Sequence, residues 1–116
     1  MYKFYDKYNL GEPYVYIHPY RQEDVRRLVE QIPDWVQYLI VFGSSVRVYC
    51  KMTSDLDLCV IGPGKFSEDF LSMFENGVDV IYYDSVCNYL GKVKQIPFSA
   101  SGDSYRKGVV VYARQD

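Results

Sequence analysis

The sequence predicts an α/β fold (α+β in arrangement) in which a small mixed β-sheet is flanked by helices. In some segments apolar residues recur at three- and four-residue spacing, which is typical of amphipathic helices. In others they run continuously or alternate with polar residues, which is typical of strands. The two kinds of segment alternate along the chain. With 116 residues, 48% of them hydrophobic, the chain has enough apolar material for one compact domain.

The predicted elements follow one another with short connections. They are a helix over 22–32, a buried strand over 36–42, a short helix from Ser44 to about Lys51, a strand over 55–61, a helix from Ser67 to Phe74, a strand over 78–83, a helix from Asp84 or Ser85 toward Leu90, and a strand over 109–112. Pro33 ends the first helix. A short strand over 14–17 belongs to a Tyr-rich N-terminal extension, residues 1–21, and the domain itself is expected over 22–116.

Composition disfavours several classes of function. A net charge of −2 gives no positive field for a polyanion, so strong nucleic-acid binding is not expected. Cys50, Cys59 and Cys87 match no zinc or redox spacing, which favours a reducing cytoplasm. We see no export signal and no apolar run long enough for a membrane helix, and therefore expect a soluble cytoplasmic protein. The single histidine, His18, is assigned no catalytic role.

Tyrosine is over-represented, with 13 residues in a chain that is 17% aromatic. An excess of tyrosine is typical of partner-binding surfaces, because the ring is apolar and the hydroxyl is polar. Half-buried strand positions use tyrosine for the same reason. The composition leaves both interpretations open.

A candidate phosphate site follows the strand over 36–42, where Gly43 and Ser44 interrupt the apolar run. Glycine allows backbone torsions closed to other residues and lets a ligand approach the main chain. Ser44 then begins the short helix, whose free backbone N–H groups can bind the phosphates of a nucleotide. A Gly-Ser pair alone is also typical of an ordinary turn and helix cap, so the neighbouring motifs decide its meaning.

Two carboxylates follow on the next strand, in the pattern Asp55-Leu56-Asp57-Leu58. Because strand side chains alternate, Asp55 and Asp57 share one face. Two such charges about 4 Å apart repel by roughly 4 kcal/mol at an effective dielectric of about 20, so a compensating cation is expected. Mg²⁺ prefers one or two carboxylates completed by water and substrate phosphates. The predicted ligands are therefore Mg²⁺ and ATP or another nucleoside triphosphate.

Asp79 adds a third carboxylate among the apolar residues of the strand over 78–83. If the two strands are neighbours, Asp79 can act as a general base toward an attacking hydroxyl or complete the ligands of a second metal ion. Any one aspartate alone is more typical of a solvent-facing strand position. The three acids together with the Gly-Ser turn favour a metal-dependent nucleotide site.

These motifs resemble the DNA polymerase β-type nucleotidyltransferase superfamily, with a strand, Gly-Ser, a short helix, Asp-x-Asp and a lone aspartate on the next strand. The small size resembles the minimal nucleotidyltransferase domains that are antitoxin partners of HEPT-domain toxins. The similarity covers about residues 22–114 and implies the nucleotidyltransferase fold. These domains commonly continue Gly-Ser-x-Ala-Arg-Gly, whereas Val48 replaces the last glycine here.

The resemblance also implies roles for the motif residues. It implies nucleotide binding by Gly43, Ser44 and Arg47, and catalysis with metal binding by Asp55, Asp57 and Asp79. The implied reaction transfers a nucleoside monophosphate, often AMP from ATP, to a hydroxyl and releases pyrophosphate. In the antitoxin branch the acceptor is a tyrosine of the small helical HEPT-type partner.

Two other functions stay open. A binding module could neutralise a toxin by covering it, with the acid site inactive, and the tyrosine excess and the altered turn at Val48 motivate this alternative. A small-molecule nucleotidyltransferase would act on an aminoglycoside-type drug or sugar hydroxyl. Enzymes of that kind usually need a further domain to hold the acceptor, which a homodimer could replace.

Overall fold

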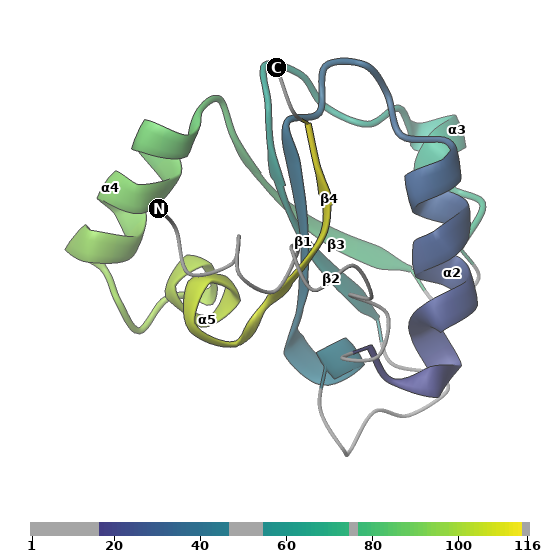
Figure 1. Ribbon diagram of the computed structural model, residues 1–116, viewed down its shortest axis with the longest axis horizontal. Coiled ribbons are helices and arrows are strands. Elements are labelled where there is room, and N and C mark those ends of the chain that lie inside the picture. The colour runs from purple at the N-terminus through teal and green to yellow at the C-terminus, as the bar shows by residue number, and fades with distance from the viewer. Residues whose placement is uncertain (1–16, 47–54, 75–76, 115–116) are drawn as a thin grey trace.

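The computed structural model describes residues 17–46, 55–74 and 77–114 as a sheet covered by helices on both faces (Figure 1). The elements are α2 (Pro19–Glu30), β1 (Tyr38–Phe42), the 3-10 helix η2 (Gly43–Val46), β2 (Leu56–Ile61), α3 (Glu68–Leu71), β3 (Val78–Tyr83), α4 (Val86–Gln95), α5 (Ala100–Lys107) and β4 (Val109–Ala113). Helices α2 and α3 lie on one side of the sheet, and α4 and α5 lie on the other. None of the helices in these ranges could cross a membrane.

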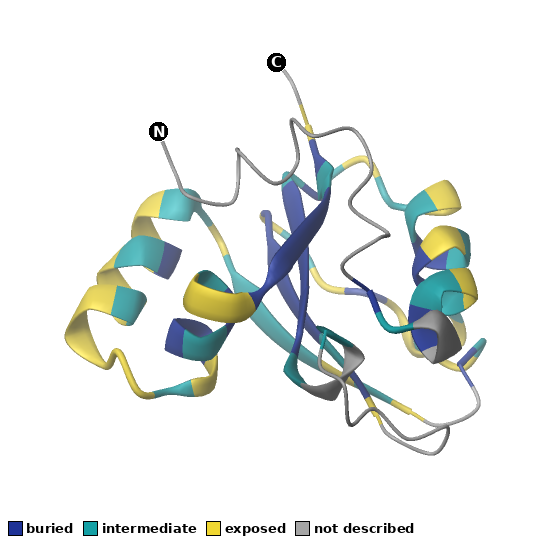
Figure 2. Ribbon diagram, turned by 60° about the horizontal axis from the view of Figure 1, so that its bottom comes forward, coloured by how far each residue is buried: buried dark blue, intermediate teal, exposed yellow. Residues whose placement is uncertain are grey.

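The four strands form one mixed sheet in the order β3-β2-β1-β4. The central strand β1 runs antiparallel to both β2 and β4, whereas β2 and β3 are parallel. All of β1 is buried, and so is β2 apart from Asp57, because helices cover both faces of their continuous apolar runs (Figure 2). The predicted α/β architecture with a small mixed sheet is confirmed.

Alternating strand residues build two separate cores. On one face Leu58 of β2 packs in a cluster with Leu28 of α2. On the other face Cys59 packs in a cluster with Tyr89 of α4. Burial raises the pKa of the Cys59 thiol to about 12, so Cys59 stays neutral and serves as a small packing residue.

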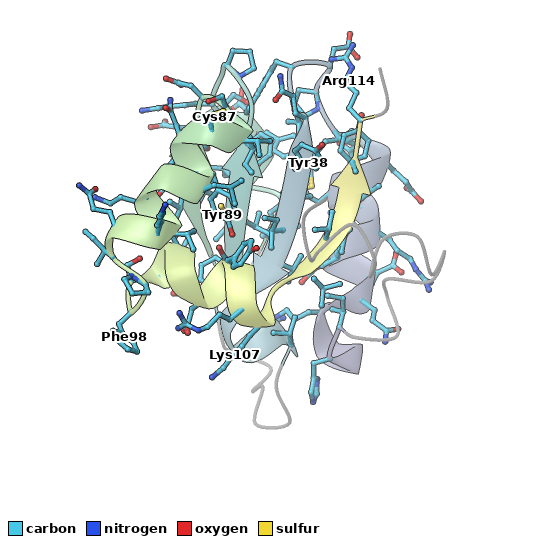
Figure 3. The ribbon with its side chains drawn as sticks, turned by 60° about the vertical axis from the view of Figure 1, so that its left-hand side comes forward. Tyr38, Cys87, Tyr89, Phe98, Lys107 and Arg114 are labelled. Carbon is cyan, nitrogen blue, oxygen red and sulfur yellow. The ribbon has the colours of Figure 1, made fainter. Side chains whose placement is uncertain are left out.

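Hydrogen bonds between hydroxyl groups hold α5 against the core on the α4 side of the sheet. The Tyr89 hydroxyl, which points from α4 toward the sheet, lies 2.7 Å from the hydroxyl of Ser104 (Figure 3). The Ser104 hydroxyl in turn donates to the backbone carbonyl of Ser101. Tyr83 of β3 hydrogen-bonds to the Ser101 hydroxyl. These bonds leave the buried serines satisfied and fix which side of α5 faces the sheet.

Several boundaries differ from the sequence prediction. The helix predicted from residue 22 begins at Pro19, and Ile17, predicted to end a strand, lies in a bend, while residues 14–16 are outside the described ranges. Only Gly43–Val46 of the short helix expected after β1 is described, as a 3-10 helix. Helix α5 was not predicted, because its glycine, serines and aspartate have low helix propensity and Tyr105 is its single large apolar residue.

Gly102→Ala should lower the free energy of unfolding, because an added Cβ would collide with the backbone carbonyl of Pro97. We expect a loss of about 1 to 3 kcal/mol, which is typical of overpacking. Gly91→Ala is the matched control in α4, since a Cβ there meets no atom within 4 Å. It should stabilise the helix by about 0.5 to 1 kcal/mol. Urea denaturation followed by circular dichroism compares the two, and effects of the same sign would contradict this packing of α5.

Candidate active site

The candidate site lies where β1 ends and where β2 and β3 begin. Antiparallel pairing sets Asp57 opposite Phe42, and the parallel register of β2 and β3 sets Asp57 beside Asp79. Asp79 therefore lies on the strand adjacent to that of Asp57. The predicted roles of Asp79, as general base or as a further metal ligand, require neighbouring strands. Both acids project on the side of the sheet that α4 and α5 cover, because Cys59 and Ile81, two residues further along each strand, belong to that core.

A pocket of about 510 Å³ opens beside these acids. The sheet and α5 share its walls, which are formed by Phe42, Gly43, Asp57, Asp79, Val80, Ile81, Ala100 and Asp103. Its volume lies in the range of small-ligand sites, which is roughly 300 to 1,000 Å³. The pocket thus joins an acidic edge of the sheet to a helix that the sequence did not predict.

Two glycines with positive φ lie beside the acids, and the missing side chain of Gly43 makes room for one of them. Gly43 has φ of +73°, and a Cβ at this position would overlap the carboxylate of Asp57. Gly77 has φ of +86°, and its Cβ would lie 3.4 Å from the carboxylate oxygen Oδ1 of Asp55. Gly43 was expected to let a ligand approach the main chain. In the structure the space beside it already holds the Asp57 side chain.

Burial and the neighbouring carboxylates raise the pKa of Asp57. Burial is the largest cause that raises the pKa of Asp57 above the ordinary value of 3.8, followed by the negative charges of Asp79 and Asp55. Asp55 itself is exposed immediately before β2 and influences Asp57 through its charge. The site therefore holds negative charge for which a bound cation would compensate.

The donor chemistry of the site suits magnesium. Within the described ranges, no three His, Cys, Asp or Glu side chains are grouped closely enough to hold a metal ion by themselves. Magnesium does not require such a group, because it takes one or two carboxylates and fills its other positions with water and substrate phosphates. Asp57, together with Asp79 or Asp55, can supply these one or two carboxylates.

The remaining predicted residues are placed only in part. Ser44 follows the pocket residue Gly43 in η2, and η2 contacts α5. Arg47 is outside the described residues. The roles assigned to these residues and to the three aspartates stay predictions.

Sequence reasoning missed Asp103, which lines the pocket from α5. Its carboxylate accepts a hydrogen bond of 3.0 Å from the guanidinium of Arg106. The ends of α5 carried the available sequence signals. Ser99 is its N-cap and accepts a hydrogen bond from the backbone N–H of Gly102, and basic residues occupy its last turn.

Asp57→Asn should raise the free energy of unfolding at neutral pH. The folded-state pKa of Asp57 lies above the ordinary 3.8, so ionised Asp57 destabilises the fold above that raised pKa, and the penalty vanishes as the pH falls below about 3.8. We expect a gain of up to about 1 kcal/mol at pH 7, because water screens these partly exposed charges.

Urea denaturation between pH 7 and pH 3 measures this gain. Asp34→Asn is the control, since Asp34 is exposed before the opposite end of β1 and should give no comparable gain. A gain for Asp57→Asn of equal size at both pH values would contradict the electrostatic explanation.

Comparisons with known proteins agree with the motif analysis. The sequence model of the nucleotidyltransferase domain family matches residues 22–112. No curated protein sequence matches the chain.

Two solved structures are similar to the chain. One is a mutant of the toxin–antitoxin MntA–HpeT, which is 16% identical with a TM-score of 0.43, covering 82% of this chain and 74% of that chain. The other is a candidate nucleotidyltransferase from Sulfolobus solfataricus, which is 18% identical with a TM-score of 0.44, covering 89% of this chain and 86% of that chain. Because the family model spans most of its length, this chain belongs to the nucleotidyltransferase domain family.

Proposed function

We propose that this domain transfers a nucleoside monophosphate, AMP from ATP, to a hydroxyl of a partner protein, and that it is the antitoxin of a HEPT-type toxin. The observation that carries the proposal is the pairing of Asp57 with Asp79 at a pocket of about 510 Å³. Membership of the nucleotidyltransferase family supports transferase chemistry. The resemblance to antitoxin domains supports a protein acceptor.

Asp57, with Asp79 and Asp55 beside it, would hold Mg²⁺ in the proposed site. The ion, when bound, supplies charge stabilisation to the transferring phosphoryl group. Asp57 suits this role because it is half-buried between β1 and β3, where strand pairing fixes its position. Rigid placement of a ligand is what phosphoryl transfer chiefly requires from a protein.

Asp79 suits the role of general base. It is exposed on β3, which is an edge strand of the described sheet, so a hydroxyl from another molecule can reach its carboxylate. In the proposed step Asp79 accepts the hydroxyl proton while the hydroxyl oxygen bonds to the α-phosphorus. The bond from that phosphorus to the bridging oxygen breaks, and pyrophosphate leaves with the electron pair.

The triphosphate would lie against the turn after β1. We assign its binding to Gly43, Ser44 and Arg47, and Gly43, where η2 begins, lines the pocket. Asp57 occupies the space beside Gly43, so the carboxylate that would hold the metal ion adjoins the turn that would hold the phosphates. Magnesium would supply charge stabilisation to those phosphates when bound.

Asp57→Asn should reduce nucleotide transfer by at least about 100-fold, because the site loses a carboxylate that would hold the Mg²⁺ ion, and with it the stabilisation of charge on the transferring phosphoryl group. The assay incubates the protein with magnesium, α-labelled ATP and the product of the neighbouring gene, and intact mass spectrometry detects the added nucleotide. Asp34→Asn, exposed and distant from the pocket, should keep wild-type activity. Wild-type protein that transfers no nucleotide from any nucleoside triphosphate would overturn the proposal.

An inactive antitoxin is the second candidate. It is favoured by the excess of tyrosine and by Val48 in the altered turn. In this case the domain would neutralise its partner by covering it, and neutralisation would not require the acids.

The double variant Asp55→Asn, Asp57→Asn separates the two candidates in a growth assay with the toxin. If transfer is the mechanism, the variant should form the complex and yet fail to restore growth, because two carboxylates of the site are lost. Circular dichroism checks that it folds. Full rescue by this variant would establish the covering mechanism in place of transfer.

A further inference from the structure

An exposed apolar corner joins α4 to α5. Phe98 is 93% exposed and Ile96 is 44% exposed, and they are the exposed large hydrophobic side chains of the described ranges. The Phe98 side chain projects away from the helices (Figure 3). Single exposed apolar residues are common, but here Ile96, Pro97 and Phe98 are consecutive and all exposed. The Phe98 ring adds nothing to either core, so folding does not account for it.

Arg106 connects this corner to the acid pocket. Its guanidinium carbon lies 5.9 Å from the centroid of the Phe98 ring, and the group donates to the backbone carbonyl of Pro97. The same guanidinium pairs with Asp103 at 3.0 Å, and Asp103 lines the pocket together with Asp57. A molecule seated on Phe98 would therefore lie next to the wall of the candidate active site.

Positive charge surrounds the corner. Residues 86–107 contain four basic side chains and one acidic side chain, a net charge of +3 in a chain whose total is −2. Lys92 and Lys94 are exposed in the last turn of α4, directly before the corner. The helix dipole favours such positions for lysine, but it does not explain why they flank an exposed aromatic ring.

We propose that the α4–α5 corner, formed by Ile96, Pro97 and Phe98 with Lys92, Lys94 and Arg106, is the docking surface for the acceptor protein. The complementary partner surface is an apolar pocket surrounded by acidic side chains. The inference rests on the proposed function, since it names where that acceptor binds. Ala100, which lines the pocket, follows Phe98 by two residues, so docking brings the acceptor to the acids.

A protein fits this corner better than a nucleic acid does. A polyanion that reached the lysines would also meet the carboxylates of Asp57, Asp79 and Asp103 in the adjoining pocket. A protein with a local acidic rim avoids that repulsion, because its charges can be confined to the area opposite the lysines.

The test measures binding to the product of the neighbouring gene by isothermal titration calorimetry. Phe98→Ala should weaken the complex by about 10- to 30-fold, as for an aromatic anchor at an interface. Its thermal unfolding should match that of the wild type, because the ring is almost wholly exposed. Lys94→Glu should weaken binding by about 5- to 10-fold at low salt and by less at high salt.

Lys65→Glu is the matched control for charge, because Lys65 is exposed and lies 5.7 Å from the Tyr82 ring, on the face that α2 and α3 cover. It should leave affinity unchanged. Wild-type affinity of both Phe98→Ala and Lys94→Glu would overturn the proposal. So would the absence of any complex with this protein, or binding of a single-stranded oligonucleotide in its place.

The outcome is independent of the transfer assay. If the complex forms and Phe98→Ala weakens it while no nucleotide is transferred, the proposed function fails and the docking surface stands. If transfer occurs and Phe98→Ala changes neither binding nor KM for the acceptor, the proposed function stands and the docking surface fails.

Discussion

The site depends on placing two carboxylates side by side at the end of a sheet whose interior is apolar. Asp57 interrupts a strand that is otherwise buried, and its carboxylate fits only because Gly43, directly after β1, has no side chain. Burial, and then the negative charges of Asp79 and Asp55, raise the pKa of Asp57, so its ionised carboxylate weakens the fold locally. The sheet tolerates this because β1 and β2 are covered on both faces by apolar clusters. Stability supplied by the cores thus permits an electrostatically unfavourable site.

The two faces of the sheet differ in kind. The face toward α2 and α3 is a cluster of apolar side chains, and its interactions are those of an ordinary core. The face toward α4 and α5 combines apolar contacts with hydroxyl pairs, in which Tyr83 and Tyr89 hold the serines of α5. These two tyrosines therefore have a structural role. The tyrosine-rich composition alone left open whether they would be structural or would form a partner-binding surface. Their hydroxyls also fix the helix that forms the far wall of the acid pocket.

The strands were predictable because burial imposes a local pattern on them. Long apolar runs, such as Val109 to Tyr112, mark a strand without knowledge of its neighbours. The spacing of Asp55 and Asp57 likewise predicted a shared face, but it could not predict the parallel register that sets Asp79 beside Asp57. Helix α5 lacked a periodic apolar signal, since tertiary hydrogen bonds replace apolar packing along part of its inner side. The contribution of Asp103 to the pocket was therefore not predictable from sequence.

The Arg106 guanidinium can couple ligand binding in the pocket to binding at the α4–α5 corner. It contacts the Phe98 ring on the surface and the Asp103 carboxylate at the pocket, so one cation is shared between the two places. A ligand that changes the charge balance around Asp103 alters how firmly Arg106 is held, and a molecule covering Phe98 alters the same cation from the outside. Thermodynamic linkage requires these influences to be reciprocal. If a ligand in the pocket changes affinity at the corner by some factor, a partner at the corner changes affinity in the pocket by the same factor.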